Sequence, residues 1–122
     1  MENLINWFEI PALDFNRAVA FYKAIFSASI QETEMFGTKM GFLPSDGNNL
    51  SGAIVSGEGY APSMEGVTVY LNGGNDLQAM LDKIEEHAGK VIVPKTQISP
   101  EMGYFAMFID TEGNKLALHS KN

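Results

Sequence analysis

A short turn sequence occurs twice in this chain, 66 positions apart, and this repeat limits the folds that the chain can adopt. Ser45-Asp46-Gly47-Asn48-Asn49-Leu50 matches Thr111-Glu112-Gly113-Asn114-Lys115-Leu116. A strand pattern followed by a helix pattern spans residues 7–26, and the same order returns in residues 67–88, about 60 positions later. A chance match of two turns would not explain the shared order of five elements. Each half is therefore predicted to be β-α-β-β-β.

The first half begins with a short alternating strand, Trp7 to Ile10, which ends at Pro11. Asp14 is a candidate helix N-cap, because its carboxylate can accept the free N–H groups of a first turn. Apolar residues then recur at helical spacing: Phe15, Ala18, Val19, Tyr22, Ile25 and Phe26. Further strands are expected at residues 29–35, 39–43 and 50–56, with Gly37 in the turn between the first two.

The second half starts with a β-branched strand, Val67 to Leu71. Asn75 or Asp76 can cap the next helix, and Gly89 stands where a left-handed C-cap glycine is expected. Strands are predicted at residues 90–95, 104–109 and 115–119, the last two joined by a turn at 110–114. Residues 57–65 contain two glycines and one proline and are the expected linker.

The length of 122 residues suits a single domain over residues 1–122. Its first module covers about 4–56, the linker about 57–65 and the second module about 66–120. Hydrophobic residues make up 45% of the chain, which is enough for a core. Neither half is long enough to be stable alone, so we expect the two halves to share that core.

Charge and composition exclude several partners. The net charge is −7 with only 8 Lys and Arg, so a nucleic-acid or anionic-membrane partner is not expected. No segment approaches the roughly 18 to 20 apolar residues of a membrane span, and Met1 to Trp7 lacks the features of a secretory signal. The chain has no cysteine, so disulfides and thiolate chemistry are excluded. These features predict a cytoplasmic protein.

Two stretches of sequence resemble the vicinal-oxygen-chelate superfamily, which includes glyoxalase I, bleomycin-binding proteins, fosfomycin-resistance enzymes and ring-cleaving dioxygenases. One runs from Phe8 to Asp14 and continues as Arg17-Ala18-Val19-Ala20-Phe21-Tyr22; the other is Asp110 to Leu116. The resemblance covers about residues 4–120. It implies an α+β fold in which two tandem βαβββ modules form a curved mixed sheet around a cleft, with the helices on the convex side. It also implies a homodimer.

Metal-dependent members of this superfamily place one ligand (His, Glu or Gln) on the first and one on the last strand of each module. Aligning those positions puts Trp7, Val67 and Ala117 at three of them and a residue within 51–53 at the fourth. None of these side chains offers a carboxylate or a nitrogen with a free lone pair, and a lone serine hydroxyl would hold a divalent ion only weakly. No metal or other cofactor is therefore expected; a divalent metal in an atypical site is the alternative.

Strand alternation extends the predicted cleft face. Ligand-binding residues would be Trp7, Val67, Val69 and Ala117. Glu9 and His119 would also face the cleft, where they could act as a catalytic acid–base pair or simply stay in solvent. Trp7 could be a stacking platform or a core filler, and His87 is expected at a solvated helix end. Several soft side chains could line a cavity, a dimer seam or the core: Met35, Phe36, Met40, Met64, Met102, Tyr60 and Tyr104.

The sequence thus predicts a metal-free protein that binds a small, partly apolar or aromatic molecule in its cleft. One alternative is a lyase, isomerase or dioxygenase-type enzyme of the same superfamily, with an atypical metal site or with the Glu9 and His119 pair. Another is a structural or regulatory protein whose cleft is filled by its own side chains. The sequence does not identify the ligand.

Overall fold

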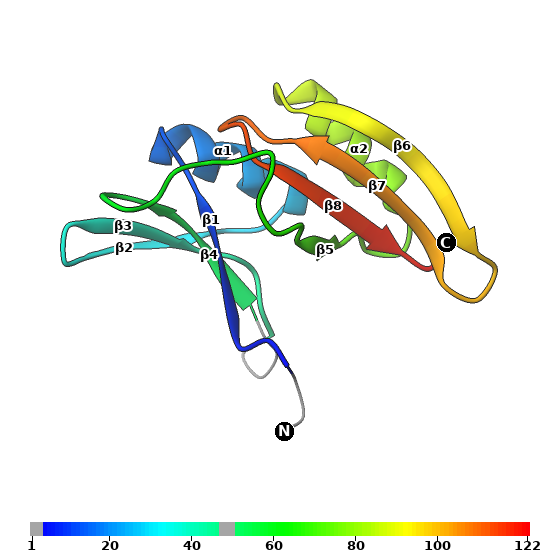
Figure 1. Cartoon of the computed structure of the whole chain (residues 1–122), viewed down its shortest axis with the longest axis horizontal. Coiled ribbons are helices and arrows are strands. Elements are labelled where there is room, and N and C mark those ends of the chain that lie inside the picture. Colours follow the sequence, from blue (N-terminus) through cyan, green and yellow to red (C-terminus); the bar gives the residue numbers. More distant parts are fainter. Residues whose placement is uncertain (1–3, 47–50) are drawn as a thin grey trace. The chain divides into compact units, whose positions relative to one another are not determined.

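One sheet and one helix are built from each half of the chain (Figure 1). The computed structural model describes residues 4–46 and 51–122. The chain forms two units, Met1–Pro62 and Ser63–Asn122. The turn expected at 45–50 lies mostly outside the described residues, as does the expected strand start at Leu50.

The first unit contains a four-stranded mixed sheet in the order β1-β4-β3-β2. Its strands are β1 (Trp7–Pro11), β2 (Gln31–Met35), β3 (Thr38–Phe42) and β4 (Ser51–Ser56). β1 runs parallel to β4, and the other neighbours are antiparallel. Met35 and Thr38 close the β2–β3 hairpin around Gly37, which has a φ of 80° as its place in the turn requires.

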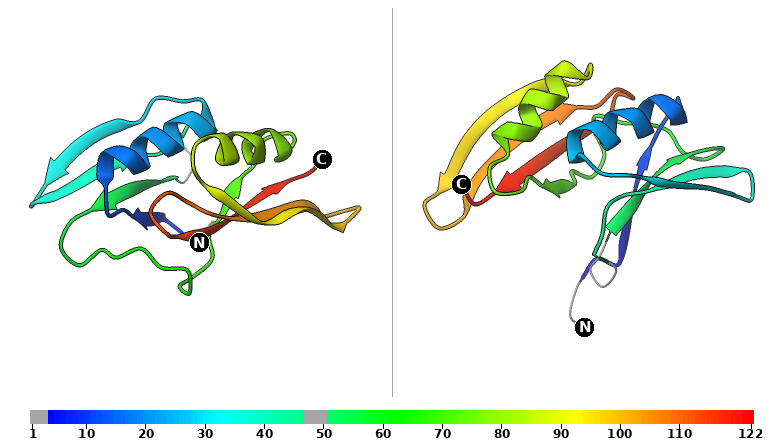
Figure 2. Two further views of the ribbon diagram at one scale, coloured as in Figure 1. Left: turned by 90° about the horizontal axis from the view of Figure 1, so that it is seen from above. Right: turned by 180° about the vertical axis from the view of Figure 1, so that it is seen from behind.

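Helix α1 (Phe15–Phe26) covers one face of this sheet (Figure 2). It begins as predicted, because Asp14 Oδ1 accepts the backbone N–H of Arg17 at 3.1 Å. Gly41 on β3 lets the helix come close: a Cβ there would lie 3.2 Å from Val19 and 3.1 Å from Ile30. The apolar stripe read from the sequence is the buried side of the helix, except for Phe26.

The second unit repeats this plan with the order β5-β8-β7-β6. Its elements are β5 (Tyr70–Asn72), α2 (Gln78–Glu86), β6 (Lys90–Ser99), β7 (Gly103–Ile109) and β8 (Lys115–Ser120). β5 is parallel to β8, as β1 is to β4. The α+β class and the two βαβββ modules, each with a mixed sheet and one helix, are confirmed.

Three details of the second unit differ from the expectation. The strand predicted at Val67 to Leu71 begins only at Tyr70, because Val67 is 92% exposed and has no ladder partner among the described residues. Leu77, without a side-chain cap, stands at the N-cap of α2, while Asp76 accepts the N–H of Gln78. β6 continues to Ser99, four residues beyond its predicted end.

The C-terminal end of α2 also differs by one residue. Ala88, not Gly89, adopts the left-handed conformation, with a φ of 72°. The N–H of Gly89 bonds to the carbonyl of Ile84 at 2.9 Å, which is the outer bond of a Schellman cap. The cap therefore forms around an alanine, the residue before the glycine that the sequence suggested.

The predicted turn at 110–114 is held by a buried polar network. Asp110 Oδ1 accepts the N–H groups of Glu112 and Asn114, both at 2.9 Å, and its Oδ2 accepts Nδ2 of Asn114. The side chain of Asn114 in turn accepts the N–H of Ser63 at 3.0 Å. This turn therefore fixes the start of β8 and the beginning of the second unit.

Among the described residues, no helix is long and apolar enough to cross a bilayer.

Candidate functional site

Each sheet has a face that its own helix does not cover, and the predicted site residues of the first unit lie on that face. Strand register places Trp7 beside Ser51, and Glu9 beside Ala53. Ala53 in turn lies beside Phe42 on β3. Phe8 and Ile10 alternate to the helix side, as predicted. We call the residues Trp7, Glu9, Phe42, Ser51 and Ala53 the first face.

Trp7 has an accessible ring. The residue is 44% exposed, so it does not simply fill the core. The ring makes an edge-type contact with Phe42, with centroids 6.2 Å apart and planes at 63°. The neighbouring Ser51 is small, and its hydroxyl donates to the carbonyls of Leu43 and Pro44. The indole is thus fixed at one edge and open to a flat ligand.

Glu9 is exposed, and its carboxylate accepts a hydrogen bond from a residue far away in the sequence. The hydroxyl of Tyr60, which follows β4, donates a hydrogen bond to the Glu9 carboxylate, and this bond raises the pKa of Tyr60. The N–H of Tyr60 bonds to the carbonyl of Gly57 at 3.2 Å. The sequence placed Tyr60 among the soft residues that could line a cavity, but nothing in it indicated Glu9 as the partner.

The second sheet carries an equivalent helix-free face. Tyr70 lies beside Ala117, Asn72 beside His119, and His119 beside Phe105. Since Ala117 stands 66 positions after Ser51, the same interval as the repeated turn, Tyr70 is the equivalent of Trp7. The sequence had given that position to Val67, which is a misalignment of three residues. We call Tyr70, Asn72, Phe105, Ala117 and His119 the second face.

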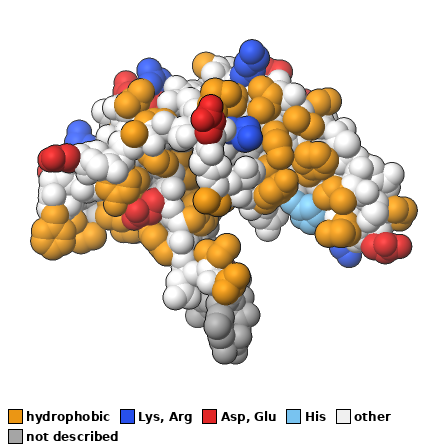
Figure 3. Space-filling view, viewed as in Figure 1, with side chains coloured by type: hydrophobic (Ala, Val, Ile, Leu, Met, Phe, Trp, Pro, Cys, Tyr) orange, Lys and Arg blue, Asp and Glu red, His pale blue; other side chains and the backbone are white. Residues whose placement is uncertain are grey.

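The two faces have a common pattern. An aromatic residue, Trp7 or Tyr70, stands beside a small residue, and both aromatic residues are about half exposed, at 44% and 52%. A phenylalanine follows on the third strand in each unit, Phe42 in one and Phe105 in the other. Hydrophobic side chains reach the surface in both units (Figure 3). Both faces therefore present ring surfaces to a ligand.

The remaining predicted ligand-binding residues contribute less. Val67 lies before β5 and is almost fully exposed. Val69 is half-buried, and its carbonyl accepts the N–H of Ala117 at 3.0 Å. Ala117 itself is fully buried between neighbouring strands. The structure thus gives Val69 and Ala117 a part in joining β5 to β8.

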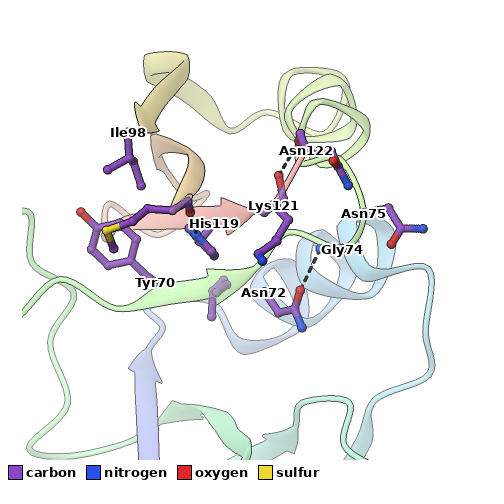
Figure 4. A pocket seen from close by; sticks show the side chains of 11 residues that line it. Tyr70, Asn72, Gly74, Asn75, Ile98, His119, Lys121 and Asn122 are labelled. Carbon is purple, nitrogen blue, oxygen red and sulfur yellow. Dashed lines mark hydrogen bonds between the residues drawn. The ribbon is translucent and has the colours of Figure 1, made fainter. Parts of the chain in front are cut away.

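His119 lines a groove of about 740 Å³ in the second unit (Figure 4). Its Nε2 lies 2.6 Å from the carbonyl oxygen of Met102. A carbonyl only accepts, so Nε2 carries the hydrogen, and Nδ1 of a neutral ring has the lone pair. Other side chains of the groove include Tyr70, Ile98, Met102 and Lys121. Of these, the sequence singled out only Met102, as a soft side chain.

Glu9 and His119 belong to different units, and neither unit brings the two side chains together. Their action as an acid–base pair stays a prediction. His87 lies at the exposed C-terminal end of α2, where its Nδ1 bonds to the carbonyl of Lys83 at 2.8 Å. This is the solvated helix end that the sequence indicated.

The residues at the superfamily's ligand positions do not fit a divalent metal. With the corrected register these residues are Trp7, Ser51, Tyr70 and Ala117. They provide an indole, two neutral hydroxyl groups and a methyl group, whereas such ions prefer imidazole or carboxylate ligands. Within residues 4–46 and 51–122, no group of three or more His, Cys, Asp or Glu could hold a metal ion.

Comparison with known proteins gives consistent matches over nearly the whole chain. The chain is 30% identical to a glyoxylase-like domain-containing protein from Didymella fabae, over 93% of this chain and 91% of that protein. The structure is similar to that of TnmS3, an antibiotic-binding protein from Streptomyces sp., with a TM-score of 0.74, 21% identity and coverage of 98% and 97%.

It is also similar to the fosfomycin resistance protein FosX from Listeria monocytogenes, with a TM-score of 0.69, 15% identity and coverage of 100% and 96%. These two likenesses show the fold. The family model for the Glyoxalase/Bleomycin resistance protein/Dioxygenase superfamily matches residues 4–118. The chain therefore belongs to this superfamily.

Proposed function

We propose that this protein binds a small, partly aromatic molecule on its helix-free sheet faces, without metal chemistry. The observation that supports this is the replacement of metal ligands by half-exposed rings. Trp7 and Tyr70 occupy equivalent strand positions where metal-dependent relatives carry a ligand, and each lies beside a small residue. An exposed aromatic ring of this kind can stack against the ring of a ligand.

The relatives agree with a binding role but do not define the ligand. TnmS3 is an antibiotic-binding protein, and the fold is thus compatible with a binding role. The groove beside Tyr70 and His119, at about 740 Å³, has the size of a small-molecule site. Its walls combine apolar side chains with a few polar groups, as in sites for partly apolar ligands.

A neutral naphthalene alcohol tests the proposal directly. We expect calorimetry to detect its binding, and Trp7→Ala or Tyr70→Ala to weaken it roughly tenfold, because an aromatic contact contributes about 1 kcal/mol or more. Trp7→Phe keeps a ring and should retain most of the affinity. Ile92→Ala, which removes a 39% exposed side chain outside the groove, is the matched control.

Two outcomes would contradict this function. One is the absence of binding by naphthalene compounds of any charge. The other is binding that Trp7→Ala and Tyr70→Ala leave unchanged while thermal unfolding shows both variants to be folded, since the rings would then have no part in recognition.

The second candidate is an enzyme that uses His119 as a base. The bond from Nε2 to Met102 supports it, because this bond leaves Nδ1 of the neutral ring as a proton acceptor. Such a lyase or isomerase would exchange a proton next to a carbonyl. Deuterium exchange into small hydroxyketones, followed by NMR, should then depend on His119, and equal rates for wild type and His119→Gln would exclude this role.

A further inference from the structure

The charges of the first unit are segregated between the two sides of its sheet. Within residues 4–46 and 51–62, the Lys and Arg residues are Arg17, Lys23 and Lys39. The first two lie on α1. Lys39 lies on β3 two residues before Gly41. Strand alternation therefore directs its side chain to the same side as Gly41, which is the helix side. The first face is therefore without a cation from any described strand of this unit.

Glu9 is the charged residue that the strands of this unit place on the first face. The other acidic strand residues, Glu32 and Glu34, pair across the hairpin with Gly41 and Lys39 and so share the helix side. The hydrogen bond from Tyr60 comes from a neutral donor. It orients the carboxylate without neutralising it, and a carboxylate has lone pairs for further donors. Its neighbour on β4, Ala53, is small and buried, so this neighbour brings no further charge to the first face.

Aromatic surface lies next to this carboxylate. Trp7 is two residues before Glu9 on β1, so the two side chains point the same way, with their Cα atoms about 6 to 7 Å apart. The indole is accessible and is the ring that attracts a cation most strongly through its face. An anion and an open indole at this distance suit one protonated nitrogen better than they suit an anionic or neutral group.

We propose that the first face binds the protonated amine of a flat aromatic ligand, with the nitrogen on Glu9 and the ring on Trp7 and Phe42. This inference rests on the proposed function and specifies its ligand as an aromatic or heteroaromatic amine. Tyr60 acts as a positioning residue that holds the Glu9 carboxylate beside the indole. The net charge of −7 favours the approach of such a cation.

Three probes of one shape test the charge preference: naphthylmethylamine, naphthylmethanol and naphthylacetate. At pH 7 and low salt, calorimetry on the full chain should show the amine binding about tenfold more tightly than the alcohol, and the acetate most weakly. Amide shifts in NMR spectra should change at β1 and near Tyr60 on addition of the amine.

Variants separate this inference from the proposed function. Glu9→Gln should reduce amine affinity to that of the alcohol and leave alcohol binding unchanged, and Tyr60→Phe should give a smaller loss of the same kind. Glu34→Gln removes an equal charge from the other side of the sheet and should have no effect. Equal binding of amine and alcohol by the wild type would overturn the inference while the proposed function stands. No binding of any probe would overturn both.

Discussion

At the residue scale, the alternation of side chains along β1 and β8 decides which of them face away from the helices. It placed Trp7 and Glu9 opposite Ile10 on β1, and His119 opposite Leu118 on β8, and the structure has this arrangement. The same reasoning failed at Val67, because an extended segment before a strand has the same residue types as the strand itself. Ladder partners decide where β5 begins, and they are distant in the sequence.

Asp110 should contribute strongly to stability, because three buried or partly buried N–H groups depend on its carboxylate. We expect Asp110→Ala to lower the free energy of unfolding by about 3 kcal/mol, since the donors lose their acceptor. Urea unfolding measures this loss. Asp14→Ala removes an exposed cap bond and should cost only about 1 kcal/mol. Equal losses in the two variants would show that water replaces the Asp110 carboxylate.

At the element scale, helix starts were easier to predict than helix ends. Asp14 caps the start of α1 through a hydrogen bond from the N–H of Arg17, three residues later, so both partners lie in the local sequence. The end of α2 depends on which residue turns left-handed, and Ala88 does so although Gly89 follows it. The reason is the outer cap bond, which requires the N–H of residue 89 to reach Ile84. A glycine in the sequence indicates such a cap but does not determine which residue adopts the left-handed conformation.

Ala88→Gly should therefore stabilise the protein. Alanine at a φ of 72° is strained, and glycine adopts this conformation without steric strain. The expected gain is about 1 kcal/mol in the free energy of unfolding, measured by thermal or urea unfolding. Ala20→Gly, at an exposed site within α1, should have the opposite sign and cost about 1 kcal/mol. A loss of stability in Ala88→Gly would contradict the assigned cap.

At the scale of the whole molecule, the repeat predicted the two modules, and the chain passes from one unit to the next within the expected linker, between Pro62 and Ser63. The sequence could not predict the bond from Tyr60 to Glu9 or the groove beside His119. Both bring together residues that are distant along the chain. The single domain, the homodimer and the cytoplasmic location stay predictions; sedimentation velocity would test the dimer.

Titration with divalent metals tests the proposal that the protein works without a metal. This test belongs to the whole molecule, because a metal site would need ligands from several strands. We expect Ni, Zn, Mn, Fe(II) and Co ions to leave the melting temperature of the metal-stripped, tag-free protein unchanged. Trp7, Ser51, Tyr70 and Ala117 offer no imidazole or carboxylate to such an ion.

A true site would be easy to detect in this titration. An ion at a thousand times its dissociation constant adds about 4 kcal/mol of stability, which for a domain of this size raises the melting temperature by on the order of 10 °C. If one ion gave such a rise, and Glu9→Gln or His119→Gln abolished it, these residues would be ligands of an atypical site. The metal-dependent enzyme would then replace the binding protein as the better account of this chain.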